Sequence, residues 1–169
     1  MEASEMARGP RTVAHAATDS GKEYPMATVF DVAAYILQKQ GRLTAMKLQK
    51  LVYYAQAWSL VWDEAPLFKS KIQAWANGPV SPALYQVHKG IFSLGRKMVT
   101  DGDPDNLSPT QADVVDRVLK FYGDKSAQYL SDLTHAESPW KDARKGMSPG
   151  ERGEREITHA AMAEYYGSL

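Results

Sequence analysis

The sequence has no cysteine in its 169 residues. This absence excludes disulfide bonds, a thiolate nucleophile and any zinc site that uses cysteine ligands. A surplus of charge is also lacking: 20 Lys and Arg balance 20 Asp and Glu, so no strong overall field draws the protein to nucleic acid or to an anionic membrane. The apolar runs fall far short of the roughly 20 residues that a membrane-spanning helix needs, and no signal-peptide pattern opens the chain. We therefore expect a soluble, cytoplasmic protein without a membrane partner.

Signatures of catalysis are scarce as well. The sequence has no glycine-rich phosphate loop, no G-x-S-x-G elbow and no H-E-x-x-H pair. His135 and Glu137 resemble the His-x-Glu element of zinc deaminases, but that chemistry needs cysteine ligands. His88, His135 and His159 could form a metal site with scattered carboxylates only by long-range coincidence. We expect no enzyme, no cofactor and no metal; the alternative is a cryptic enzyme that uses His135 or Glu137.

Length and composition fit one globular domain with a short tail. The hydrophobic share is 44% and the charged share 24%, and a domain of this size buries roughly 68 to 70% of its unfolded surface. Residues 1–25 are rich in Ala, Ser, Thr, Gly and charge and show no apolar periodicity. We predict a flexible N-terminal tail over 1–25, or alternatively a recognition segment read by another protein, and a folded domain over 26–169.

The stretch from Thr44 to Trp62 carries the strongest helical pattern. Its apolar residues recur at steps of three and four: Leu48, Leu51, Val52, Ala55, Trp58 and Trp62. With Thr44 as the N-cap, the pattern predicts a central helix of about 28 Å. Lys47, Lys50 and Tyr53 on this helix either form a surface that grips a partner, or belong to a buried helix with two solvated lysines.

The remaining helices are predicted from their start signals. Thr28 and Asp31 form a capping box, and Thr158 caps a last helix. Three further starts place Pro directly after a Ser cap: Ser81-Pro82, Ser108-Pro109 and Ser138-Pro139. We predict a mainly α fold, a compact single-domain bundle of about seven helices. One small β-hairpin is a further candidate element, near Ile72–Trp75 and Lys97–Thr100.

A basic strip is one functional hypothesis. Lys47 and Lys50 lie one turn apart, and Lys89, Arg96 and Lys97 surround a short loop, so these cations could contact nucleic acid. Zero net charge and the buried character of the central helix argue against this. Solvated lysines are the simpler interpretation.

Several short blocks occur in a specific order. They are Leu43-Thr44, Lys47-Leu48-Gln49-Lys50-Leu51, Tyr53-Tyr54-Ala55-Gln56, Trp58, Pro66-Leu67-Phe68, Ile72-Gln73-Ala74-Trp75, Gly78-Pro79-Val80, Tyr85, Leu130, Leu133-Thr134-His135, Pro139-Trp140, Ala143-Arg144, Ile157 and Tyr165-Tyr166. Their order and spacing resemble the Panacea domain, a family that takes in SocA-type antitoxins and phage-associated GepA-like proteins. The resemblance covers about Thr28 to Tyr166. Ala45 and Ala65 depart from it, because the family usually has Pro and Gly there.

This resemblance implies a bacterial antitoxin that neutralises a cognate toxin by direct protein contact. In the SocA branch the antitoxin is a proteolytic adaptor that delivers its toxin to the ClpXP protease, so delivery to ClpXP and simple sequestration are the two routes expected here. The alternative is a phage-associated nucleic-acid-binding or regulatory helical protein.

Ten residues are candidates for binding the partner. They are Lys47, Lys50, Tyr53, Trp75, Gly78, Pro79, Val80, Tyr85, His135 and Trp140. Trp75 and Tyr85 are plausible hot spots, since aromatic side chains give much apolar area with few rotamers to freeze. The alternative is that both anchor the Asn77-Gly78-Pro79 turn onto the core. His135 and Trp140 could equally form a structural contact at a helix end.

Overall fold

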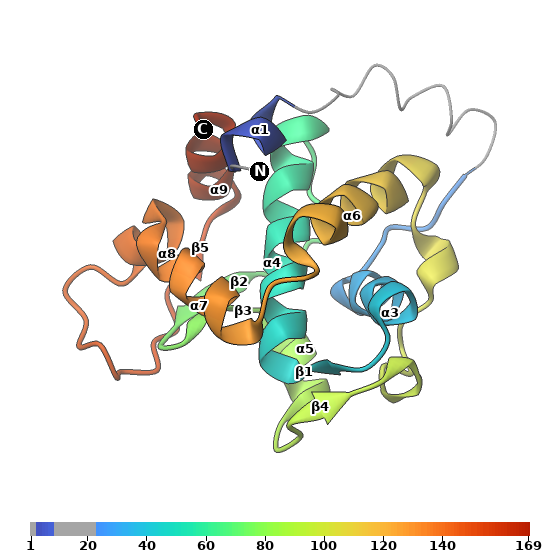
Figure 1. Ribbon diagram of the computed structural model, residues 1–169, viewed down its shortest axis with the longest axis horizontal. Helices are drawn as coiled ribbons and strands as arrows, with labels where there is room; N and C mark the ends of the chain where they lie inside the picture. Colours follow the sequence, from blue (N-terminus) through green and yellow to red (C-terminus); the bar gives the residue numbers. More distant parts are fainter. Residues whose placement is uncertain (1–2, 9–22) are drawn as a thin grey trace.

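The computed structural model describes residues 3–8 and 23–169. Helix α4 runs through the centre of the molecule and is flanked by helices on two sides (Figure 1). The elements around it are α3 (Val29–Gln40) and α6 (Pro109–Tyr122) on one side, and α7 (Ala127–Ala136), α8 (Ser138–Ala143) and α9 (His159–Gly167) on the other. The predicted mainly α, single-domain class is therefore confirmed.

Helix α4 (Ala45–Trp62) is buried almost all the way round. Within it only Met46 and Lys47 are not buried. The predicted apolar stripe is present, but residues outside that stripe, such as Tyr54 and Leu60, are buried as well because helices pack on two sides. Thr44 caps the helix by accepting a hydrogen bond from the Lys47 amide, as its hydroxyl predicts. The chain is thus folded around one helix.

Most of the predicted helix starts are confirmed. Thr28 and Asp31 form a reciprocal capping box, Ser108 and Gln111 form a second, and Ser81 caps α5 (Pro82–His88). Thr158 likewise caps α9.

The predicted Ser138 cap is wrong by one residue. Glu137 is the N-cap of α8, its side chain makes no capping hydrogen bond, and Ser138 is the first helical residue. The physical reason is that α8 follows α7 without a linker. Glu137 serves both as the C-cap of α7 and as the N-cap of α8.

The small hairpin exists, but its second strand was predicted in the wrong place. Strand β2 (Ile72–Trp75) pairs antiparallel with β3 (Gly78–Val80), whereas 96–98 forms a 3-10 turn, η1. The Asn77-Gly78 turn signal itself folds the chain straight back, since Gly78 has a φ of +124°. The other edge of β2 pairs with β5 (Glu156–Ile157), which brings the C-terminal part of the chain to the hairpin.

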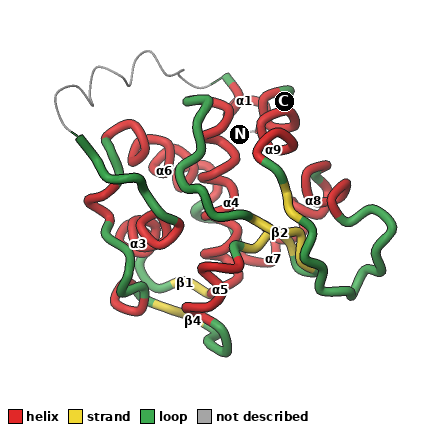
Figure 2. The backbone as a smooth tube through the Cα atoms, turned by 180° about the vertical axis from the view of Figure 1, so that it is seen from behind, coloured by secondary structure: helices red, strands yellow, loops and turns green. Residues whose placement is uncertain are grey.

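A second, two-stranded pairing lies at the start of α4, and a further 3-10 helix lies against α3. Strand β1 (Leu43–Thr44) pairs with β4 (Ser93–Leu94), and the 3-10 turn η2 (Pro104–Asn106) contacts α3. Seen from behind, α5 and β2 lie beside the same half of α4 (Figure 2).

The segment predicted as a flexible tail includes a short helix. Helix α1 (Ala3–Ala7) buries Met6, whose carbonyl accepts a 2.7 Å hydrogen bond from the Trp62 indole. Helices α1 and α9 lie next to each other at the far end of α4 (Figures 1 and 2). Residues 1–2 and 9–22 of the predicted tail lie outside the described residues. In the described part of the chain, no helix has the length and apolar character to cross a membrane.

Candidate partner-binding groove

A groove of about 630 Å³ opens between α4, the β2–β3 hairpin and α5. Four of the ten candidate residues line it: Lys50, Trp75, Val80 and Tyr85. Residues of the loop at 90–92 and of the loop at 150–152 complete its lining. We call this cavity the groove.

Two aromatic rings and one guanidinium form a wall of the groove. The Trp75 and Tyr85 rings meet edge to face with centroids 4.9 Å apart. The Arg152 guanidinium lies 3.9 Å from the Trp75 ring centroid and 5.3 Å from that of Tyr85. Trp75 and Tyr85 are each only half-buried, so they present ring surface to the groove while packing on each other. Their packing on each other fits the turn-anchor interpretation, and the ring surface that stays exposed leaves the contact-surface interpretation as a prediction.

Lys50 forms the floor. Its side chain is 1% exposed, and its Nζ donates a 3.0 Å hydrogen bond to the Pro79 carbonyl. Burial lowers the pKa of this ammonium to about 7. The pKa values of His88 and His135 are also lowered, first by burial and then by the charge of Lys50. A titratable cation thus lies directly beneath the groove.

Gly78 gives Lys50 the space that it occupies. A Cβ at position 78 would lie 2.5 Å from Lys50 Cε and 3.1 Å from Thr134 Oγ1. The φ of +124° is a second reason for glycine at this position. Gly78 and Pro79 are both buried, so they shape the groove from below and do not line it.

Gln49 and His88 join α4 to α5 under the groove. The Gln49 side chain accepts from the Ser81 amide at 2.9 Å, and its Nε2 donates to the Ser81 carbonyl at 3.2 Å. The same Nε2 lies 2.9 Å from His88 Nε2. Sequence analysis missed Gln49, although a polar residue next to the apolar stripe of a central helix was a usable signal.

The rim carries an exposed aromatic side chain on a fixed backbone. Phe92 is 83% exposed, and the adjacent Ile91 is 37% exposed. The Phe92 carbonyl accepts a 2.9 Å hydrogen bond from the Ala45 amide at the start of α4, and the Ile91 amide donates to the His88 carbonyl at 2.7 Å. Phe92 could not be predicted as a site residue, because a single apolar residue in a loop has no periodicity.

The opposite rim is held by one buried arginine. Arg144 is 6% exposed, and its guanidinium donates to the carbonyls of Ala74, Ser148, Pro149, Glu151 and Arg152. Trp140 adds a 2.8 Å hydrogen bond from its indole to the Trp75 carbonyl. The loop that presents Arg152 is therefore fixed to the strand that presents Trp75. Arg152 itself was not predicted as a site residue.

The other candidate residues lie away from the groove. Lys47 Nζ donates to the Gly123 carbonyl at 2.7 Å, and Tyr53 is buried with its hydroxyl 3.0 Å from that of Tyr166. His135 stacks on Trp140 with ring centroids 3.9 Å apart. In the structure, these three side chains connect neighbouring segments of the fold.

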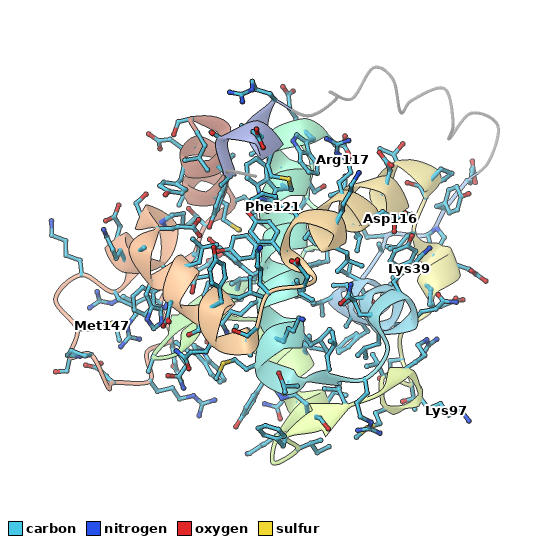
Figure 3. The ribbon with its side chains drawn as sticks, in the orientation of Figure 1. Lys39, Lys97, Asp116, Arg117, Phe121 and Met147 are labelled. Atoms are coloured by element: carbon cyan, nitrogen blue, oxygen red, sulfur yellow. The ribbon has the colours of Figure 1, made fainter. Side chains whose placement is uncertain are left out.

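The basic strip is not assembled on the surface. Lys50 is buried and Lys47 bonds to a carbonyl, while Lys97 projects from the outer edge of the molecule (Figure 3).

Glu137 lies in the core and not in a cavity. The hydroxyls of Tyr54 and Tyr166 each donate to Glu137 Oε1 at 2.7 Å. Burial raises the pKa of this carboxyl, and the two tyrosine hydrogen bonds act in the opposite direction. His135 and Glu137 therefore occupy different environments. Across the described residues, no group of three or more acidic or histidine side chains has a geometry that could hold a metal ion.

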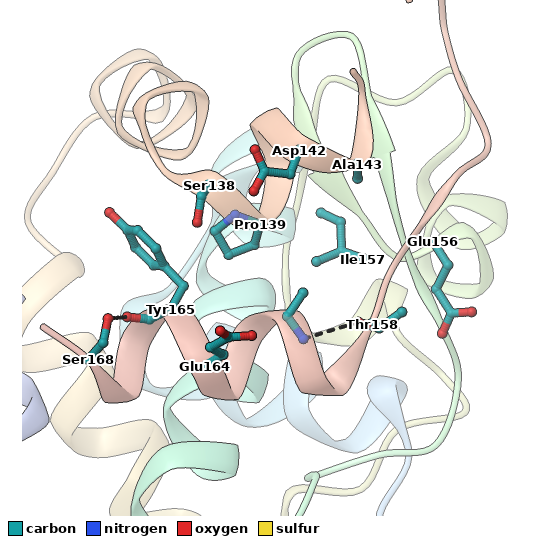
Figure 4. Close-up of a pocket in the computed structure, with 11 residues that line it drawn as sticks. Ser138, Pro139, Asp142, Ala143, Glu156, Ile157, Thr158, Glu164, Tyr165 and Ser168 are labelled. Atoms are coloured by element: carbon teal, nitrogen blue, oxygen red, sulfur yellow. Dashed lines mark hydrogen bonds between the residues drawn. The ribbon is translucent and has the colours of Figure 1, made fainter. Parts of the chain in front are cut away.

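A second cavity of about 400 Å³ lies between α8 and α9 (Figure 4). Asp142 reaches it from α8 and Glu164 from α9, and Glu156 lies at its edge. None of the ten candidate residues lines it. Its charge is opposite to that of the groove, which contains Lys50 and Arg152.

Comparison with known proteins identifies the family. The family described as "Antitoxin SocA-like, Panacea domain" matches residues 48–141, more than half of the chain. The protein named Antitoxin SocA, from Caulobacter vibrioides (strain NA1000 / CB15N), is 32% identical, over 64% of this chain and 66% of that protein, just under two thirds of its length. No solved structure matches. The matched segment includes Lys50, the hairpin and Phe92 but ends before Arg152. The chain belongs to the SocA-like Panacea domain family of antitoxins.

Proposed function

We propose that this protein neutralises a cognate toxin by binding it directly through the groove and its rim. The observation that carries the proposal is Phe92, a large apolar side chain that is 83% exposed on a loop whose backbone is hydrogen-bonded to α4. A rigid aromatic side chain beside a cavity is the arrangement that protein-protein hot spots use. Because the loop is already fixed, little conformational entropy is lost on binding.

The groove supplies the complementary half of such an interface. Trp75 and Tyr85 form an aromatic wall, and Arg152 lies against it. Aromatic residues and arginine are enriched at interface centres. A toxin segment that enters the groove could thus contact both Phe92 and Arg152. No catalytic step is needed for this function.

Two outcomes of binding are distinguished by one experiment. The tagged protein is used to capture partners from its own host, in cells whose ClpXP is catalytically trapped, and the captured proteins are identified by mass spectrometry. Recovery of one small protein in stoichiometric amount together with the ClpX subunit of the protease indicates a proteolytic adaptor. The partner alone indicates sequestration. Recovery of no stoichiometric protein would overturn the proposed function.

A further inference from the structure

The groove is positively charged inside a protein that has no net charge. Among the described residues that line it none is Asp or Glu, whereas Lys50 and Arg152 are cations and His88 can become one. The whole chain, by contrast, balances 20 basic with 20 acidic residues. The excess of positive charge is therefore a local property of this cavity.

Both cations retain unused capacity to bind an anion. An ammonium has three N–H donors, and within the described part of the chain the acceptor found for Lys50 Nζ is one carbonyl, that of Pro79. No described carboxylate lies within 4.0 Å of either Lys50 or Arg152. A guanidinium presents five donors, and that of Arg152 is exposed above the Trp75 ring. A buried ammonium without a counter-ion is costly, so an anion that enters the open cavity above Lys50 would stabilise its charged form.

The walls favour an anion attached to an apolar group. Met46, Val80, Ile91 and Phe92 line the groove together with the Trp75 ring. An inorganic anion such as phosphate would leave these apolar surfaces without a contact. A carboxylate in a peptide, by contrast, has neighbouring apolar side chains that can contact these walls.

We infer that the groove binds a carboxylate of an acidic toxin segment, with Arg152 as its direct partner, Lys50 as the buried charge beneath it and the aromatic wall as the contact for an adjacent apolar side chain. This inference rests on the proposed function for the identity of the partner. Lys50 acts through its charge as much as by contact, because a charge in a low-dielectric environment is weakly screened. His88 also lines the groove, and its pKa is lowered first by burial and to a lesser degree by the charge of Lys50.

The test uses a minimal probe in place of the toxin. N-acetyl-L-phenylalanine combines a carboxylate with an apolar ring, and N-acetyl-L-phenylalaninamide is its neutral match. Both are titrated into the 15N-labelled full chain and followed by NMR. We expect the acid to perturb the Trp75 indole and the His88 ring with a Kd on the order of 1 mM, which suits a ligand of this size. The amide should bind at least about tenfold more weakly.

Matched variants assign the charge. Arg152→Gln and Lys50→Met should each lower the affinity for the acid about tenfold, the effect of losing one charge-assisted contact. Lys97→Gln, an exposed cation outside the groove, should leave it unchanged. Because the pKa of Lys50 is about 7, affinity should also fall as pH rises from 6.5 to 8.5 in the natural protein but not in Lys50→Met. His88, His135 and Arg152 are the other charged or titratable groups near Lys50, and they remain in that variant.

The outcomes separate this inference from the proposed function. Equal binding of acid and amide, no perturbation at the groove, or unchanged affinity in both variants would overturn the inference even if toxin capture succeeds. Tighter binding of an octathymidylate than of the acid would overturn it in favour of nucleic acid. If the acid binds as expected but no toxin is captured, the carboxylate site stands and the antitoxin proposal falls.

Discussion

At the scale of single residues, Lys50 is the clearest example of a side chain that costs stability. An ordinary lysine has a pKa of 10.5, whereas burial lowers that of Lys50 to about 7. The folded state therefore binds this proton less tightly than the unfolded chain. Lys50 therefore imposes no protonation penalty on the folded state above pH 10.5, and this penalty grows as pH falls towards 7. A methionine would fill similar space without that penalty.

We predict that Lys50→Met raises the free energy of unfolding at pH 7 by about 1–4 kcal/mol. Urea denaturation at a series of pH values between 7 and 9.5 provides the measurement. The natural protein should gain stability across this range, and the variant should be nearly flat. Lys97→Met serves as the matched control and should follow the natural protein. A variant less stable than the natural protein at pH 7 would contradict this account.

Gly78 is the residue on which the position of Lys50 depends. Gly78→Ala places a methyl group 2.5 Å from Lys50 Cε and also forces an unfavourable φ. We predict a loss of about 2 kcal/mol or more in the free energy of unfolding. In a Lys50→Ala background the clash with Lys50 disappears, while the close contact with Thr134 and the unfavourable φ remain, so the same substitution should cost less. Equal costs in both backgrounds, read from urea curves, would show that Lys50 and Gly78 do not compete for space.

At the scale of secondary-structure elements, Glu137 joins helices that are distant in sequence. Its carboxylate lies at the junction of α7 and α8 and receives Tyr54 from α4 and Tyr166 from α9. Tyr53 extends the contact through its 3.0 Å hydrogen bond with Tyr166. One carboxylate thus fixes the position of three helices against the central one.

Two substitutions at this junction should have unequal effects. Glu137→Gln keeps an Oε1 acceptor for both tyrosine hydroxyls, so a loss of about 1 kcal/mol or less is expected. Glu137→Ala leaves two buried hydroxyls without an acceptor and should cost about 3 kcal/mol or more. Thermal unfolding followed by circular dichroism measures both. Similar losses for the two variants would mean that charge, and not hydrogen bonding, is what Glu137 supplies.

The structure of the loop at 90–92 leads to a prediction about toxin binding. Phe92→Ala removes the exposed ring without altering the backbone hydrogen bonds of the loop, so we expect toxin affinity to fall by about 2 kcal/mol or more with unchanged stability. Tyr129→Ala is the matched control, because Tyr129 is 51% exposed on α7 and does not line the groove. Calorimetry with the captured toxin compares the two. If Phe92→Ala and Tyr129→Ala changed toxin affinity equally, Phe92 would not be part of the interface.

The elements differ in how far the sequence could predict them. Helix starts depend on residues three positions apart, so Thr28, Ser108 and Thr158 were recognisable as caps. Strand β5 could not be foreseen because two residues have no pattern and its partner lies more than 80 positions earlier. The same limit applies to the candidate site. Trp75 and Tyr85 were found through their aromatic character, but Arg152 reaches them only through the tertiary fold.

At the scale of the whole molecule, charge is separated between two cavities. The groove contains Lys50 and Arg152, and the second cavity contains Asp142 and Glu164. Because the net charge is zero, attraction of a partner depends on these local fields and not on the molecule as a whole. A partner that approaches the groove with an acidic segment is oriented before contact.

This separation predicts the salt dependence of toxin binding. Raising the salt concentration from about 50 mM to about 500 mM should lower the association rate about threefold to tenfold and leave the dissociation rate nearly unchanged. Surface plasmon resonance with the captured toxin measures both rates. Arg152→Gln should reduce the salt effect, whereas Lys97→Gln should not. An association rate independent of salt would show that the groove does not steer its partner.

The way in which Arg144 holds the loop at 148–152 has an evolutionary consequence. All five of its acceptors are main-chain carbonyls, four of them in this loop, so the shape of the loop does not depend on the side chains it carries. Those side chains can therefore be exchanged while the rim of the groove keeps its form. During evolution, proteins of this kind could come to bind a different toxin through substitutions at 148, 149, 151 and 152 alone, while the rest of the fold stays the same.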